Sequence, residues 1–152
     1  MTTFYADTSA LLKRHVSESG TLEIERLVDF PATIMTSELS RVEMYSALNR
    51  LVREGGLRAS EYKELSTDIE NLFAARYLLV PVTVDIIKIA KGILERHPLR
   101  AYDSVHLASA IFANQELVTG GQLGLTFVCS DQRLLAAAAA ESLLTFDPSA
   151  AA

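Results

Sequence analysis

Two short stretches of the chain place a carboxylate directly after an apolar run. In FYADTSALL the carboxylate is Asp7, in FVCSDQRLLAAAA it is Asp131, and a segment that favours helix follows each at once. The carboxyl ends of the strands of a parallel sheet lie at one edge, where open α/β folds bind their ligands. We therefore expect Asp7 and Asp131 to face the same crevice.

Two further acids are candidates for this crevice. Glu43 lies in SRVEMYSALNR, and Asp103 lies in the first turn of the apolar helical segment RAYDSVHLASA. The spacing around Glu43 predicts a helix whose apolar face carries Val42, Tyr45, Leu48 and Val52. Each acid also has a purely structural interpretation: Asp7 and Asp131 as helix caps, Asp103 as a complement to a helix dipole, and Glu43 as a solvated surface acid.

Carboxylates that are brought together repel one another and raise one another's pKa unless a cation joins them. Hard divalent ions such as Mg²⁺ or Mn²⁺ prefer oxygen ligands and resolve this repulsion. Taken as a set, the four acids predict an acidic, metal-binding crevice. Nothing in the sequence joins a nucleophile to a base. His106, one helical turn after Asp103, has two interpretations: a partner of the site or its substrate, or a satisfied histidine at the edge of the core.

The elements that must position these acids alternate along the chain. Short apolar runs predict strands, and longer segments between them predict helices. The expected strands are 3–6, 33–36, 77–82, 125–129 and 143–146, and the expected helices are 8–15, 21–30, 37–54, 60–77, 84–96, 102–117 and 132–140. This order predicts an α/β fold with a mostly parallel central sheet of about five strands and helices on both faces.

Composition supports a single domain. A chain of 152 residues with 49% hydrophobic and 22% charged content is long enough for one core. We expect the domain to span residues 1–147 and residues 148–152 to be a frayed tail. No stretch is apolar for long enough to span a bilayer, so we expect no membrane association and a cytoplasmic location. The net charge of −5 argues against a broad basic face that binds nucleic acid.

Four segments, in order, resemble the acidic motifs of the PIN-domain ribonucleases, and most closely those of the VapC toxins: YADTSALLK, SRVEMYSALNR, RAYDSVHLASA and FVCSDQRLLAAAA. The resemblance implies that the metal-binding acids are Asp7, Glu43, Asp103 and Asp131, with Asp7 and Asp103 as the direct ligands. It also implies that Ser9 helps to order the site. The chain departs from many relatives at Cys129, where they carry a threonine or serine, although Ser130 is adjacent.

The resemblance further implies a function: a metal-dependent endoribonuclease that uses Mg²⁺, with Mn²⁺ as a substitute, and that acts as the toxin of a toxin-antitoxin pair. The implied partners are RNA, a VapB-type antitoxin and a second copy of the chain in a homodimer. Among the basic residues beside the acids, Arg41 and Arg100 are the first candidates for phosphate contacts.

Two other function classes are weighed against this one. A non-catalytic PIN-like module that binds RNA or protein is expected to have lost at least one acid, and this chain retains all four. A Mg²⁺-binding receiver domain is expected to carry paired acids near its first strand and a lysine that ends a late strand. The chain has neither pattern.

Overall fold

The computed structural model describes residues 1–150 and has a parallel sheet at its centre. The strands follow the order β3-β2-β1-β4-β5, and every neighbouring pair is parallel. Their bounds are β1 Thr3–Ala6, β2 Thr33–Ser37, β3 Tyr77–Val80, β4 Thr126–Val128 and β5 Leu144–Phe146. The predicted α/β architecture with a five-stranded parallel sheet is therefore confirmed.

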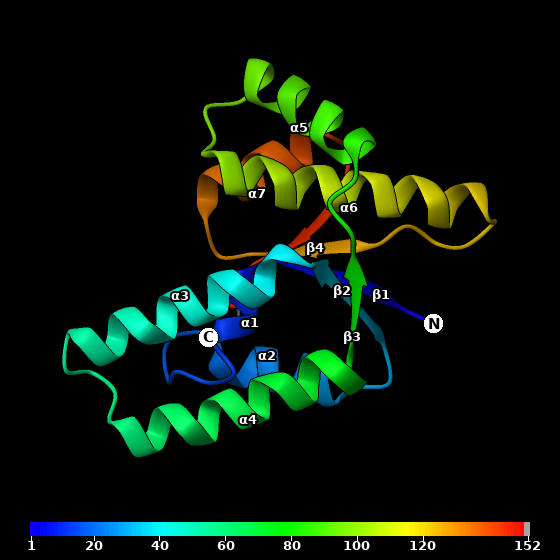
Figure 1. The fold of residues 1–152 in the computed structure, drawn as a ribbon. Helices are drawn as coiled ribbons and strands as arrows, with labels where there is room; N and C mark the ends of the chain where they lie inside the picture. Colours follow the sequence, from blue (N-terminus) through cyan, green and yellow to red (C-terminus); the bar gives the residue numbers. More distant parts are fainter. Residues whose placement is uncertain (151–152) are drawn as a thin grey trace.

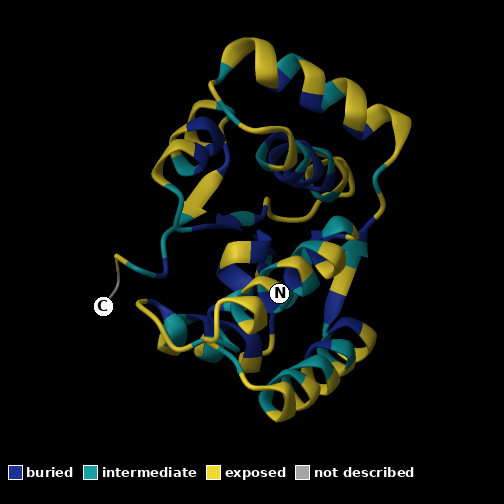
Figure 2. Ribbon diagram, turned by 60° about the vertical axis from the view of Figure 1, so that its left-hand side comes forward, coloured by how far each residue is buried: buried dark blue, intermediate teal, exposed yellow. Residues whose placement is uncertain are grey.

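Seven helices cover the two faces of this sheet (Figure 1). One face carries α5 (Val84–Arg96), α6 (Ala101–Thr119) and α7 (Gln132–Ala140), and the other carries α1 (Thr8–Leu12), α2 (Thr21–Asp29), α3 (Leu39–Arg53) and α4 (Ala59–Ala75). Buried residues gather along the strands and on the helix sides that face them (Figure 2). No helix within residues 1–150 has both the length and the apolar character needed to cross a membrane.

Strand β1 is central, and its side chains alternate between the two cores because successive residues of a strand point to opposite faces. Tyr5 packs into the core under α6, where its ring stacks on Phe127 at a centroid distance of 5.7 Å. Ala6 and Val128 belong to the core on the opposite face. The pairing continues past the strand, since the Asp7 N–H donates to the Val128 carbonyl at 3.2 Å. The end of β1 is thus anchored to the end of β4.

The structure corrects two expectations about helices. The first helix ends at Leu12 rather than at residue 15. The chain tightens there, because Arg14 and His15 donate to carbonyls three residues earlier instead of four. In α3 the buried residues are Ser40, Met44 and Leu48, whereas Val42 and Val52 are exposed. The predicted apolar face was therefore right for Leu48 and wrong for Val42 and Val52, since the buried stripe is rotated away from Val42.

The C-terminal segment packs against the loop before α2. Pro148 is buried, and the Ser149 side chain donates to the Ser19 carbonyl at 3.3 Å. Up to residue 150 this segment is a packed turn where the sequence predicts a frayed tail. The remaining two residues of the predicted tail, 151 and 152, lie outside the described residues. The turn lies close to Gly20, which has a φ of +90° and precedes α2.

We expect Gly20→Ala to lower the free energy of unfolding by roughly 1–3 kcal/mol, the range for a strained backbone position. A Cβ at Gly20 would lie 3.0 Å from the backbone carbon of Pro148, and the positive φ adds strain. Gly55→Ala is the matched control, because Gly55 also has a positive φ, +76°, but nothing lies within 4 Å of its added Cβ. Urea unfolding measures both variants. Equal losses would show that the contact with Pro148 contributes nothing.

Candidate metal centre at the carboxyl end of the sheet

Asp7 begins the site, directly after the central strand. Its Oδ1 accepts the Ala10 N–H at 2.8 Å, which caps α1, and the Ser9 hydroxyl lies 3.0 and 2.8 Å from the two carboxylate oxygens. The Cys129 thiol donates to Oδ2 at 3.2 Å. Burial raises the pKa of Asp7 above its ordinary value, although these hydrogen bonds and the nearby His106 act in the opposite direction. The structure therefore pairs the capping role with a buried carboxylate.

Asp131 occupies the equivalent position after β4. Its Oδ1 accepts the N–H groups of Arg133 and Leu134 at 2.9 and 3.1 Å, so it caps α7. The Asp131 N–H donates to the Cys129 sulfur at 3.2 Å. Cys129 thus touches both Asp7 and Asp131. Burial raises the pKa of this thiol, so it stays protonated and serves as a donor.

Glu43 reaches the site from α3. Its Oε1 accepts the Thr8 hydroxyl at 3.0 Å and lies 2.7 Å from Nε2 of His106. His106 comes from α6 and is only 2% exposed. Of the two interpretations of His106, the structure supports a partner of the site: it contacts a candidate acid from across the sheet.

Asp103 lies in the first turn of α6, as predicted. Its Oδ2 accepts a hydrogen bond from the Nε–H group of Arg100, the residue that precedes the helix, with 3.2 Å between Nε and Oδ2. The Asp103 side chain is partly exposed, whereas the guanidinium of Arg100 extends into solvent. The Asp103 carboxylate thus lies at the rim of the site, with the exposed guanidinium of Arg100 beside it.

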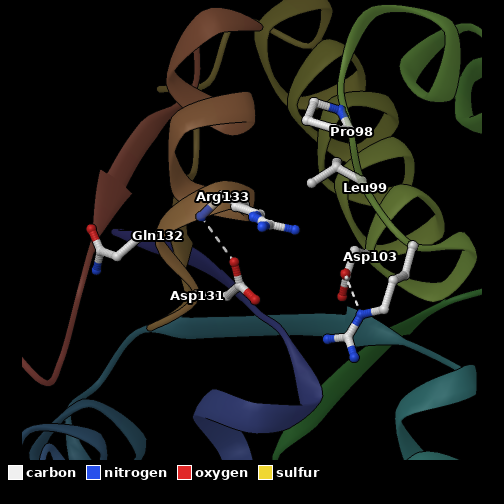
Figure 3. A pocket seen from close by; sticks show the side chains of 7 residues that line it. Pro98, Leu99, Asp103, Asp131, Gln132 and Arg133 are labelled. Carbon is white, nitrogen blue, oxygen red and sulfur yellow. Dashed lines mark hydrogen bonds and ion pairs between the residues drawn. The ribbon is translucent and has the colours of Figure 1, made fainter.

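The four acids line one cavity of about 630 Å³ at the carboxyl end of the sheet, which we call the main cavity. A second pocket of about 450 Å³, the side pocket, adjoins it and shares Arg100, Asp103 and Asp131. Figure 3 looks into the side pocket, with Asp103 and Asp131 on opposite sides of the same opening. The sequence prediction that these acids face a common crevice agrees with this arrangement.

The main cavity is lined by four carboxylates, and oxygen donors of this kind are those that a hard divalent cation prefers. Within residues 1–150, no three histidine, cysteine, aspartate or glutamate side chains are close enough to hold one ion as they stand. Three of the four carboxylates nevertheless have an oxygen without a hydrogen bond from the described chain: Glu43 Oε2, Asp103 Oδ1 and Asp131 Oδ2. A cation would also offset the cost of burying Asp7, because it neutralises the carboxylate that burial disfavours.

Two sequence candidates lie apart from this cavity. Arg41 forms an ion pair with Glu70 of α4 and lies over the Phe73 ring, 5.9 Å from its centroid, and it does not line the main cavity. Ser130 turns its hydroxyl to Ser149, at 2.9 Å, rather than to Asp131. For Ser130 the reason is local: Cys129 precedes it and already occupies the inner side of the turn.

Sequence reasoning missed Thr8 and Tyr102, which line the main cavity, whereas Arg50, which also lines it, belongs to the basic residues beside the acids. Thr8 and Tyr102 are the direct neighbours of Asp7 and Asp103 in the sequence, and this adjacency is the signal that could have found them. Arg50 lies two turns after Glu43 on the same helix, a spacing that returns it to the same side.

Comparison with known proteins connects this geometry to a family. The model of the PIN domain family matches residues 4–122. Ribonuclease VapC45 of Mycobacterium tuberculosis (strain CDC 1551 / Oshkosh) is 32% identical over 130 residues, which cover 86% of this chain and 85% of that protein. Ribonuclease VapC47 of the same strain is 30% identical over 150 residues, with coverages of 96% and 97%.

Among solved structures, VapBC2 from Rickettsia felis, bound to a DNA fragment from their promoter, matches with a TM-score of 0.64. The match covers 95% of this chain and 98% of that chain at 11% sequence identity, so it shows a common fold. The resemblance that the four motifs suggest is therefore confirmed by sequence and by fold. The chain belongs to the PIN domain family and is related within it to the proteins named ribonuclease VapC.

Proposed function

We propose that the protein is a metal-dependent endoribonuclease that hydrolyses RNA phosphodiester bonds with Mg²⁺, or Mn²⁺ in its place. The observation that carries this proposal is the main cavity, which gathers Asp7, Glu43, Asp103 and Asp131 from four elements that are distant in sequence. The names of the VapC relatives support the choice of RNA as substrate.

The four carboxylates would hold the ion, with Asp7 and Asp103 first among its ligands. When bound, a divalent ion supplies two things: a lowered pKa for an attacking water, and positive charge against the phosphate and the leaving oxygen. The chain's own residues orient these ligands. Ser9 and Cys129 fix both oxygens of Asp7, and the α7 N-terminus fixes Asp131 through Oδ1.

The substrate backbone would be bound by Arg100 and Arg50, the two arginines that line the main cavity. An anionic phosphate competes with Asp103 for the Arg100 guanidinium, so substrate binding frees an Asp103 oxygen for the ion. Arg41 was the other candidate from sequence, and its pairing with Glu70 outside the cavity argues against this role.

We expect Arg100→Gln to raise the KM for RNA about tenfold, because a hydrogen bond to a charged group contributes ~1.5–3 kcal/mol. Binding should also lose part of its dependence on salt, since fewer counterions are released. Initial rates at several RNA and salt concentrations measure both effects. Arg41→Gln is the matched control and should leave KM unchanged. Equal effects of the two changes would place the phosphate path outside the main cavity.

The experiment that tests the proposed function is cleavage of a pool of labelled structured RNAs by the purified protein. It compares Mg²⁺, Mn²⁺ and chelator, and it includes Asp103→Asn and Asp7→Asn variants with wild-type circular dichroism. Cleavage that needs the ion and both aspartates supports the proposal. Cleavage that survives chelator, or cleavage by both variants at the wild-type rate, contradicts it. Metal binding without cleavage of any RNA would favour a non-catalytic module.

We also propose that the protein acts in the cytoplasm as the toxin of a pair, forms a homodimer and is held by a VapB-type antitoxin. The Rickettsia felis neighbour was solved as a VapBC complex, which supports a partner of this kind. Induced expression of the chain without an antitoxin should arrest bacterial growth, whereas cells that express the Asp103→Asn variant should grow. Growth arrest by the variant as well would separate toxicity from the metal centre.

A further inference from the structure

A line of buried polar groups runs from the core to the main cavity. The Tyr5 hydroxyl lies 3.0 Å from Nδ1 of His106, and Nε2 of His106 lies 2.7 Å from Oε1 of Glu43. Tyr5 is fully buried and His106 is 2% exposed. The line therefore begins at Tyr5 in β1, passes through His106 of α6 and ends at Glu43 of α3, and both His106 and Glu43 line the main cavity.

The direction of these hydrogen bonds depends on which ring nitrogen of His106 carries the hydrogen. In the tautomer that satisfies the buried phenol, Nδ1 is unprotonated and accepts the hydrogen of the Tyr5 hydroxyl. The remaining ring hydrogen is then on Nε2, which donates to the Glu43 carboxylate. Thr8 donates to the same Oε1 at 3.0 Å, and its Oγ1 also lies 3.2 Å from Nε2 of His106. One oxygen of Glu43 thus receives two donors, while Oε2 has no hydrogen bond from residues 1–150.

This arrangement is that of a ligand held by its neighbours. A carboxylate on a glutamate side chain is free to rotate about several bonds, and a bound ion would have to restrict that rotation. Two donors on Oε1 restrict it in advance and leave Oε2 without a partner among residues 1–150. Groups of this kind, which orient a ligand without touching the ion, typically contribute 10- to 100-fold to metal affinity.

We propose that Tyr5 and His106 are positioning residues that hold Glu43 so that its Oε2 is presented to a divalent cation in the main cavity. The inference rests on the metal centre of the proposed function. It adds a specific role to two residues whose burial would otherwise suggest that they only fill the core. It also explains why a histidine lies inside α6 at this position, where an apolar side chain would pack without polar partners.

Calorimetric titration of Mn²⁺ into the purified, metal-free protein tests the inference without RNA. His106→Leu removes the donor and should raise the Kd for Mn²⁺ by about 10- to 100-fold. His106→Gln places an amide N–H near the position of Nε2, so it should keep the Kd within about threefold. Tyr5→Phe removes only the phenol hydroxyl and should give an intermediate increase. Ser104→Ala is the control, because this buried α6 serine bonds only to the Ala101 carbonyl.

A double-mutant cycle separates positioning from general packing. If His106 acts through Glu43, His106→Leu should cause no further loss of Mn²⁺ affinity in a Glu43→Gln background. Additive losses, or a Gln variant as weak as the Leu variant, would overturn the inference. Should His106→Leu fail to fold by circular dichroism, Tyr5→Phe and His106→Gln decide the question by the same criterion.

The outcomes distinguish this inference from the function on which it rests. Wild-type protein that binds Mn²⁺ with the expected pattern but cuts no RNA would support the positioning role and contradict the nuclease. Wild-type protein that cuts RNA while the His106 and Tyr5 variants keep their Mn²⁺ affinity would support the nuclease and contradict the positioning role. Absence of Mn²⁺ binding in the wild type would overturn both.

Discussion

Replacing Asp7 by asparagine is expected to lower RNA cleavage by at least about 10²-fold, and also to raise the melting temperature of the metal-free protein. The first effect follows from the loss of a charged ligand of the ion. A bound ion stabilises the transition state by several kcal/mol, and each ~1.4 kcal/mol of this stabilisation changes the rate tenfold. The second follows from burial, which raises the pKa of Asp7. An acid whose pKa is higher in the folded state destabilises that state above its unfolded pKa, and the penalty is therefore present at neutral pH.

Asparagine keeps the oxygen that accepts the Ala10 N–H, so the cap of α1 should survive the change. Differential scanning fluorimetry with chelator measures the stability, and RNA cleavage with Mn²⁺ measures the activity. Asp29→Asn is the control, because Asp29 is an exposed partner of Arg14 outside the cavity. Mn²⁺ should stabilise the wild type and not the Asp7 variant. A lower melting temperature for Asp7→Asn would show that its hydrogen bonds outweigh its burial.

Phe127→Ala is expected to lower the free energy of unfolding by about 3–5 kcal/mol, the range for a large-to-small change in a packed core. Phe127 is fully buried on β4, between the sheet's centre and α6, and its ring lies nearly parallel to that of Tyr5, at 10°. The change removes this stacking and leaves a void beside Tyr5. Since Tyr5 is hydrogen-bonded to His106, the void should also disturb the line of buried polar groups that runs from Tyr5 through His106 to Glu43.

Chemical denaturation measures the loss, and Phe30→Ala is the control because 57% of Phe30 is exposed to solvent. The control should change the free energy of unfolding by less than about 0.5 kcal/mol, as surface substitutions usually do. Phe127→Leu should retain more stability than Phe127→Ala, since it leaves a smaller void. A loss of less than about 1 kcal/mol for Phe127→Ala would mean that the core around Tyr5 collapses to fill the space.

The sequence predicts the sheet well, because a strand buried on both faces is apolar along its whole length. The same clarity holds for α5 and α7, whose observed bounds equal the expected ranges 84–96 and 132–140. The face of α3 was mispredicted for a physical reason. Val42 is apolar but lies at the rim of the main cavity, where no element of the described chain covers it. Hydropathy does not distinguish such a residue from a core residue.

For the site, the strand-end positions of Asp7 and Asp131 are visible in the sequence because topology places all carboxyl ends at one edge. The partners of the acids are not visible. The contact between His106 and Glu43 joins residues 63 positions apart, and it depends on how α3 and α6 approach each other over the sheet. The role of Cys129 likewise depends on the inward turn of its side chain, which also leaves Ser130 facing Ser149.

The pairing of β1 with β4 has a consequence for the synthesis of the protein. Asp7 is made 122 residues before the Cys129 thiol that donates a hydrogen bond to it. Neither this hydrogen bond nor the pairing of Phe4 with Thr126 can form until the later segment has left the ribosome. A nascent chain from which residues 126–131 have not yet emerged therefore lacks the fourth carboxylate and the thiol that supports the first. The order of synthesis itself delays assembly of the site until β4 and the residues that follow it are available.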